Sequence, residues 1–281
     1  MSETEDLRAL AFAVAYRMLG SVAEAEDVAQ EALLRLHGAE DVQNPSAFLT
    51  TATTRLAIDV LRSARVRREA YTGSWLPEPL VEDDAERRVE DEEAVSLAFL
   101  VLLERLSPDE RAVLVLRESF DYPFDEIAEI LGTSPANCRQ ILSRARRRID
   151  DDRPRFDPDP RERRRLAARF LAAARDGDMD GLLALLAPVA DQHGAARVAR
   201  AILAFYGQVE EWGVTLEPVL VNGQPGFRTI APDDRLVNVV SIDVEGGAIT
   251  RLQAVLNPDK LGHLGPLSDL GLRPVRETPP R

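Results

Sequence analysis

Cysteine is almost absent from this 281-residue chain, in which Cys138 is the only one. A single thiol excludes an internal disulfide and a cysteine-based zinc site. The chain also lacks any run of roughly 18 apolar residues, the length that a membrane-spanning helix needs. Its N-terminus, MSETEDLRAL, is acidic, whereas a secretory signal starts basic and continues apolar. We therefore expect a cytoplasmic protein in a reducing compartment.

Positive charge is scarce overall, since the formal net charge is -13. This balance argues against nonspecific nucleic-acid binding by the chain as a whole, but nucleic-acid surfaces are local. Arginines are in fact concentrated in residues 55–68 and 132–149, whereas residues 78–93 are strongly acidic. With 45% hydrophobic and 30% charged residues, the composition is that of a soluble globular protein, and the length predicts two or three domains.

Apolar residues recur at helical spacing through the first quarter of the chain. Breaks at Gly20 and Gly38 help to divide this stretch into three helices. Ser21 is a suitable N-cap for the second helix, because Glu24 follows three residues later. The predicted helices cover 7–19, 22–37 and 45–68.

An acidic, proline-containing segment follows these helices. Gly73, Pro77 and Pro79 interrupt the periodicity, and the carboxylates after them are typical of a solvated, self-repelling tether. Trp75 and Leu76 do not fit a simple tether, because an exposed Trp-Leu-Pro sequence usually packs onto another surface.

Helical periodicity resumes near residue 92 and predicts four more helices. A tight turn at Gly132 joins the last two, with Thr133 or Ser134 as the cap and Pro135 in the first turn. Two helices joined in this way predict a helix-turn-helix. The four helices cover 92–106, 109–120, 125–131 and 135–149.

The last of these helices has one apolar stripe and one arginine-bearing face. Such a helix suits the DNA major groove, where leading side chains meet base edges and arginines reach phosphates. A solvated helix end remains the alternative, because the negative end of the helix dipole attracts cations. The stripe comprises Cys138, Ile141, Leu142, Ala145 and Ile149, and the opposite face Ala136, Arg139, Gln140, Ser143, Arg146 and Arg147.

The helix over 22–37 carries an acidic stripe opposite its apolar one. Asp27 and Glu31 lie on the acidic side, and Leu34 ends it. An acidic stripe with an exposed leucine suits a basic helical partner, although a simple charged surface would look the same.

The C-terminal third predicts an α+β domain after a proline-rich linker. Helical segments precede four β-type runs separated by Asn222-Gly223, Pro232-Asp233 and Gly246-Gly247. No catalytic constellation or metal site is evident, and DGDMDG predicts an interhelical turn with a cap. Conceivable pocket residues, each also open to a structural explanation, are Asp178, His193, Tyr206, Trp212 and Asn238.

The segments AEDVAQEALLRL, AFLTTATTRLAIDVLRSARVRREAY, LSPDERAVLVLRESFDYPFDEIAEILG and SPANCRQILSRARRRI resemble, in order and spacing, the two conserved domains of an extracytoplasmic-function sigma factor. The resemblance covers residues 1 to about 150. It implies binding to the β′ and β subunits of core RNA polymerase and to promoter DNA, with no cofactor.

The resemblance also assigns residues to these roles. A helix that docks on polymerase would use Asp27, Gln30, Glu31 and Leu34. Recognition and melting of the promoter -10 element would involve Phe48, Arg55, Asp59, Arg62, Arg65, Arg67 and Arg68, although Phe48, where the family usually has tryptophan, could instead be a core residue. The -35 element would be read by Ala136, Asn137, Arg139, Gln140, Ser143, Arg144, Arg146 and Arg147.

The C-terminal third resembles the SnoaL-like domain fused to sigma-J-like members of this family. The similarity rests on YTGSWLPEP in the linker, VNGQPG and NPDKL. It implies that this domain tunes activity in place of a separate anti-sigma factor. The usual Asp-Gly-Gly-Gly segment is missing after LLALLAP, so a small-molecule site is in doubt. The expected regulatory contacts are Trp75, Leu76, Pro77, Asn257, Pro258, Asp259, Lys260 and Leu261.

The expected fold is multidomain: two all-α sigma domains, the second a helix-turn-helix, precede a truncated α+β domain of the SnoaL-like (NTF2-like) type. Two other functions remain open, a stand-alone helix-turn-helix regulator and a C-terminal domain that acts as an enzyme or ligand receptor. The predicted boundaries are a first sigma domain at 1–70, an acidic linker at 71–92, the helix-turn-helix domain at 93–151, a linker at 152–160, the regulatory domain at 161–265 and a flexible tail at 266–281.

Overall fold

A computed structural model describes residues 3–68, 77–83, 96–149, 159–186 and 192–272. The chain divides into two compact units, which we describe separately. The first combines residues 1–78 with 99–153, and the second combines 79–98 with 154–281. Among the described residues, no helix has the length and apolar character needed to cross a membrane.

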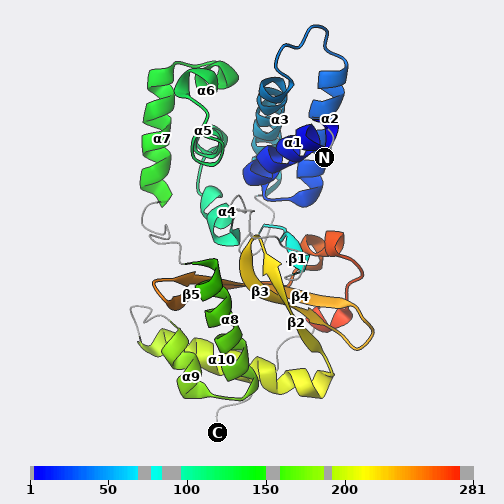
Figure 1. Ribbon diagram of the computed structural model, residues 1–281, viewed down its shortest axis with the longest axis vertical. Helices are drawn as coiled ribbons and strands as arrows, with labels where there is room; N and C mark the ends of the chain where they lie inside the picture. The colour runs from blue at the N-terminus through cyan, green and yellow to red at the C-terminus, as the bar shows by residue number, and fades with distance from the viewer. Residues whose placement is uncertain (1–2, 69–76, 84–95, 150–158, 187–191, 273–281) are drawn as a thin grey trace. The chain divides into compact units, whose positions relative to one another are not determined.

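Three helices form the N-terminal part of the first unit (Figure 1). As predicted, the hydroxyl of Ser21 accepts a hydrogen bond from the backbone N–H of Glu24 and begins the second helix. The apolar stripe of that helix is buried, with Ala25 and Ala32 at 0% exposure. The helices are α1 (Glu3–Leu19), α2 (Val22–His37) and α3 (Pro45–Arg68).

Four further helices complete the first unit, apart from the start of α4, which belongs to the second. A capping box begins α5, in which the Ser107 hydroxyl and the Glu110 carboxylate each accept from the other residue's backbone N–H. Gly132, with φ at 65°, ends α6 in the left-handed conformation that a side chain would disfavour. The helices are α4 (Leu97–Leu103), α5 (Pro108–Ser119), α6 (Phe124–Leu131) and α7 (Pro135–Ile149).

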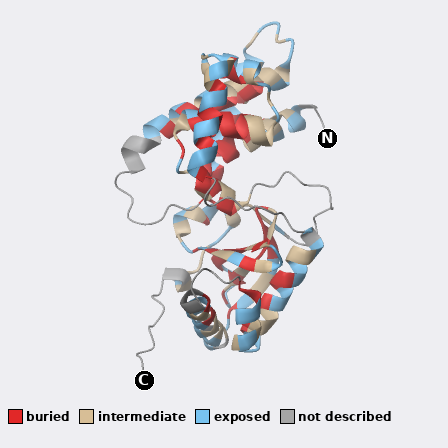
Figure 2. Ribbon diagram, turned by 90° about the vertical axis from the view of Figure 1, so that its left-hand side faces the viewer, coloured by how far each residue is buried: buried red, intermediate tan, exposed pale blue. Residues whose placement is uncertain are grey.

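The second unit packs three helices against an antiparallel sheet in the order β1-β2-β3-β4-β5. Burial follows the inner helix faces and the strands, as the red segments of Figure 2 show. The elements are α8 (Pro160–Arg175), α9 (Met179–Leu185), α10 (Gln192–Trp212), β1 (Val81–Asp83), β2 (Thr215–Val221), β3 (Gln224–Ile230), β4 (Leu236–Glu245) and β5 (Ala248–Val255).

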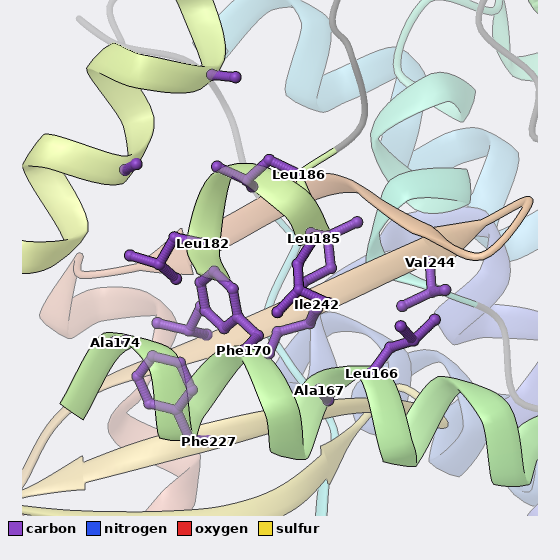
Figure 3. Packing of buried hydrophobic residues seen from close by; sticks show 14 residues of the cluster. Leu166, Ala167, Phe170, Ala174, Leu182, Leu185, Leu186, Phe227, Ile242 and Val244 are labelled. Carbon is purple, nitrogen blue, oxygen red and sulfur yellow. The ribbon is translucent and has the colours of Figure 1, made fainter. Parts of the chain in front are cut away.

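The core of this unit lies between α8, α9 and the sheet. Phe170 of α8 and Leu182 of α9 point toward Ile242 of β4, and Phe227 of β3 lies beside α8 (Figure 3). All four side chains are at most 5% exposed, so this cluster supplies the apolar burial that stabilises the unit.

Three features of the second unit differ from the sequence-based expectations. Part of the acidic linker is strand β1. Beside it, Asn222 donates its backbone N–H to the carbonyl of Leu80 at 2.8 Å, and its side-chain oxygen accepts the N–H of Leu80 at 2.9 Å. The expected tail begins with ordered structure, since Ser268 donates its N–H to the carbonyl of Leu236. His193, expected in a loop, lies in the first turn of α10.

Candidate nucleic-acid interface

One face of α2 is free of packing, because the apolar residues on its other face fill the helical core. All four residues predicted to bind polymerase are exposed on it, and Leu34 retains 61% of its accessible surface. Glu31 forms an exposed ion pair with Arg35 at 2.9 Å. The face is therefore acidic at Asp27, polar but uncharged at Gln30, partly neutralised at Glu31, and apolar at Leu34.

The N-terminus of α2 is held by Glu78, a residue from the linker that sequence reasoning missed. Its carboxylate accepts hydrogen bonds from the N–H of Val22 at 2.7 Å and from the hydroxyl of Ser21 at 3.0 Å. Its backbone donates to Gly20 and accepts from Tyr16. Because a carboxylate stabilises the positive end of a helix dipole, Glu78 strengthens the start of α2.

Two arginines of α3 that are predicted to bind DNA have protein partners on α5 and α6 of the same unit. Arg55 donates to the carbonyls of Ile130 at 2.9 Å and Glu129 at 3.1 Å, at the C-terminal end of α6. Arg62 lies 3.1 Å from the carboxylate of Asp109. Their guanidinium groups therefore have protein partners in this structure.

The other residues predicted for the -10 element divide between surface and interior. Asp59 is exposed. Phe48 is half-buried, so its ring is neither a fully buried core side chain nor a fully exposed one. Arg65, Arg67 and Arg68 lie in α3, but their side chains are outside the described part of the chain.

A buried arginine links α1 to α5. Arg111 donates to the carbonyl of Met18 at 2.7 Å and pairs with Glu104 at 2.7 Å, while only 4% of its side chain is exposed. The carbonyl satisfied by Arg111 is one of the last in α1, where cations are favoured. Sequence reasoning missed Arg111 because it resembled any polar residue of an amphipathic helix.

The two faces predicted for α7 are confirmed. Every residue of the apolar stripe is buried, whereas the opposite face is exposed. Within the stripe, burial raises the pKa of the Cys138 thiol, and neighbouring Arg139 lowers it less strongly. Asn137 is only half-exposed and donates its amide to the hydroxyl of Thr133 at 2.8 Å.

The arginines of α7 have different surroundings. Arg139 lies over the ring of Phe124, with its Cζ 5.3 Å from the ring centroid. Arg146 pairs with Glu118 at 2.7 Å and Arg148 with Glu110 at 3.0 Å, and both carboxylates are largely buried. Arg144 and Arg147 are exposed. A recess of about 410 Å³ on this surface is lined by Phe124, Arg139, Leu142, Ser143, Arg146 and Arg147.

The NPDKL segment forms a short 3-10 turn in the second unit. The side chain of Asn257 accepts from the N–H of Asp259 at 3.0 Å, and Leu261 is buried. Just beyond it, Nε2 of His263 lies 2.8 Å from the carbonyl oxygen of Pro79 in the linker. Pro77 is buried, whereas the expected partners Trp75 and Leu76 lie outside the described residues.

The second unit contains an open groove of about 410 Å³ between α8, α10, β2 and β3. Its walls are largely apolar, and Arg164, Arg175 and Tyr206 supply the ionisable groups. Burial raises the pKa of Tyr206 to about 12 despite the nearby charge of Arg175. Among the described residues, no cluster of histidine, cysteine and carboxylate side chains could hold a metal.

Two conceivable pocket residues prove to be structural. Asp178 caps α9 by accepting from the N–H of Gly181 at 2.9 Å, which confirms the turn predicted from DGDMDG. Asn238 is buried and accepts from the hydroxyl of Thr229 across the β3–β4 pair.

Family models match both helical parts of the first unit. The model described as Sigma-70 region 2 matches residues 4–67, and that described as Sigma-70, region 4 matches residues 96–149. The second match contains the helix-turn-helix and its arginine-bearing helix.

Two curated sigma factors are similar to this chain along nearly all of its length. ECF RNA polymerase sigma factor SigJ of Mycobacterium tuberculosis is 38% identical over 92% of this chain and 92% of its own. Probable ECF RNA polymerase sigma factor SigI of the same species is 34% identical over 92% and 93%. The crystal structure of M. tuberculosis SigJ superposes with a TM-score of 0.72 at 35% identity, covering 92% of this chain and 98% of that one.

Proposed function

Because this chain belongs to the extracytoplasmic-function group of sigma-70 RNA polymerase sigma factors, we propose that α2, α3 and α7 divide the steps of transcription initiation among them. The exposed face of α2 binds core polymerase, α3 acts at the promoter -10 element, and α7 reads the -35 element. The observation that carries this proposal is the arginine-bearing face of α7, opposite a fully buried stripe and within the segment matched to region 4.

The proposal for α2 rests on its free acidic and apolar face. A basic helix of the polymerase β′ subunit would meet Asp27 by charge and Leu34 by apolar contact. We expect Asp27→Lys to weaken retention by core polymerase in a pull-down, with Leu34→Ala acting in the same direction. Glu40→Lys makes the same charge change at an exposed position after α2 and serves as the control. Equal retention of all three variants would contradict the proposed contact.

The proposal for α3 requires its arginines to change partners. Arg55 and Arg62 are bonded to the helix-turn-helix part of the same unit. Contact with DNA by these side chains therefore requires them to leave their present protein partners. We expect Arg55→Gln, assayed as holoenzyme on a cognate promoter, to affect promoter opening rather than retention by core polymerase.

We further propose that the second unit modulates activity and that no separate anti-sigma factor is required. Support comes from the linker, which is built into the sheet by Asn222 and lies against His263. Asn222→Gly can keep the positive φ of 50° but removes the side-chain oxygen that accepts the N–H of Leu80. Asn222→Asp keeps an oxygen at this place. With purified core polymerase, the level of transcription by Asn222→Gly should differ from wild type, whereas Asn222→Asp should match wild type. Identical transcription from both variants would contradict modulation through this linker.

A stand-alone helix-turn-helix regulator is not favoured. Such a regulator would have no need for the N-terminal helices, yet residues 4–67 match region 2 of sigma-70. Promoter-directed transcription by core polymerase plus the full chain separates the two functions, because only a sigma factor makes core polymerase initiate at a specific promoter.

A further inference from the structure

The ring of Phe124 lies between two arginines of the helix-turn-helix. The Cζ atoms of Arg117 and Arg139 are each 5.3 Å from the ring centroid. Guanidinium groups at this distance are attracted to the negative face of an aromatic ring. Phe124 is the first residue of α6, so the ring connects the start of that helix to α7.

The two arginines differ in what else they bind. Arg117 donates to the carbonyls of Tyr122 at 3.0 Å and Asp121 at 3.4 Å, which anchors it to the loop before α6. Within the part of the chain that the structure describes, Arg139 has neither an ion pair nor a hydrogen bond, and its side chain is exposed. The ring therefore orients the Arg139 guanidinium while leaving its N–H donors available.

The surroundings of Arg139 suit a base edge better than a phosphate alone. It lies in the second turn of α7, and the N-terminal part of a recognition helix contacts bases. Phe124 and Leu142 give the adjacent recess an apolar floor, and Ser143 and Arg146 line it. Arg146 is held by Glu118 at 2.7 Å, so a second arginine beside the recess is also oriented.

We propose that Phe124 is a positioning residue for base recognition, which orients Arg139 to bind one guanine of the upstream promoter element through its O6 and N7 atoms. This inference rests on the proposed function of α7. Arginine binds guanine with two parallel hydrogen bonds from a planar fork, and a stacked fork loses less conformational freedom on binding than a free one. Phe124 thus contributes to specificity through Arg139.

The inference is tested with holoenzyme assembled from core RNA polymerase and the full chain. The probe is a duplex promoter library whose upstream element is randomised. Wild-type holoenzyme should select an element with one guanine that Arg139→Lys no longer prefers, because lysine keeps the charge and loses the fork. Phe124→Leu should reduce preference for the same guanine about tenfold, within the range of one bidentate contact. Phe124→Tyr should retain the preference because it keeps the ring.

Two measurements separate positioning from a structural role. The salt dependence of binding should keep its slope in Phe124→Leu, whereas losing a phosphate contact, as in Arg144→Gln, should reduce the slope by about one and affect all sequences alike. In the Arg139→Lys background, Phe124→Leu should cause no further loss of guanine preference. An unfolding curve that matches wild type, followed by circular dichroism, checks that Phe124→Leu is folded.

Several outcomes would overturn the inference. An unchanged guanine preference in Phe124→Leu would remove the positioning role, as would a loss spread evenly over all positions of the element. An additive loss in the double variant would show that the ring acts independently of Arg139. A wild-type holoenzyme that selects no element at all would instead refute the proposed function, and this inference with it.

Discussion

The carboxylate of Glu78 accepts a hydrogen bond from the backbone N–H of Val22 at 2.7 Å, which ties the linker to the first turn of α2. The next residues of the chain enter the other unit, where Val81 pairs with Val221 at the edge of the sheet. A segment expected to be a solvated tether is therefore bonded to a protein partner on both sides of the Glu78–Pro79 peptide.

Replacing Glu78 should destabilise the first unit. Glu78→Ala leaves buried N–H and hydroxyl groups without their acceptor, which costs roughly 1–3 kcal/mol. Glu78→Gln keeps one acceptor oxygen and should cost less, about 1 kcal/mol, from the lost charge at the helix end. Urea unfolding followed by circular dichroism measures both. Glu40→Ala, at an exposed position after α2, should be neutral. Equal stability of Glu78→Ala and wild type would contradict the capping role.

Removing the buried guanidinium of Arg111 should be among the most destabilising changes in the first unit. Arg111→Met fills similar space but leaves the Glu104 carboxylate and the Met18 carbonyl without this donor, and breaking such a pair costs about 3–5 kcal/mol. The double variant Arg111→Met with Glu104→Gln should lose less than the sum of the single changes. Thermal unfolding of the four proteins tests this, and strict additivity would show that the two side chains are not coupled.

The stability of the second unit should fall as pH rises from about 4 to 6. Burial raises the pKa of Asp243 from 3.8 to about 6, although Arg251 and Arg163 oppose the shift. The folded state therefore favours the neutral carboxyl, and its stabilising contribution is lost as pH rises through the folded pKa. Asp243→Asn should remove this decline and gain up to roughly 3 kcal/mol at pH 8 relative to wild type. Asp233→Asn, in an exposed turn, is the control for unfolding at pH 4.5 and pH 8. Parallel stability curves for wild type and Asp243→Asn would rule out the burial effect.

Two glycines of the second unit should respond to alanine in opposite directions. A Cβ at Gly226 would collide with the backbone carbonyl of Val240 and lie 2.8 Å from Val221, so Gly226→Ala should cost about 1–3 kcal/mol. A Cβ at Gly207 in α10 meets nothing within 4 Å, and alanine there should stabilise by up to about 1 kcal/mol. The melting temperatures of the two variants should thus lie on either side of the wild-type value. A gain from Gly226→Ala would contradict the close strand approach.

Local sequence patterns were sufficient to predict much of the fold. The stripe on α7, the Gly132 turn and the four β-type runs all depend on neighbours within a turn of helix or a strand pair, so periodicity predicted them. The residues of α2 that are predicted to bind polymerase are exposed, as their place opposite the apolar stripe indicates. Their roles on polymerase remain predictions.

The contacts that sequence reasoning missed share one cause, which is that they join distant segments. Basic charge, a local signal, predicted that Arg55 binds DNA, but its bonds to carbonyls 74 and 75 residues away could not be read from the sequence. Glu78 looked like one carboxylate of a solvated run, yet its acceptor role depends on the start of α2, more than 50 residues earlier.

The sequence by itself determined which segments are helices or strands, where arginines are concentrated and which family the chain resembles. These properties arise from residue types and short spacings. Only the tertiary structure decided which arginines are already bonded, that Arg139 lies over the ring of Phe124 and that the linker supplies both a helix cap and an edge strand. Hydrogen bonds and ring contacts form at distances of a few ångströms, and chain folding alone brings their partners within that reach.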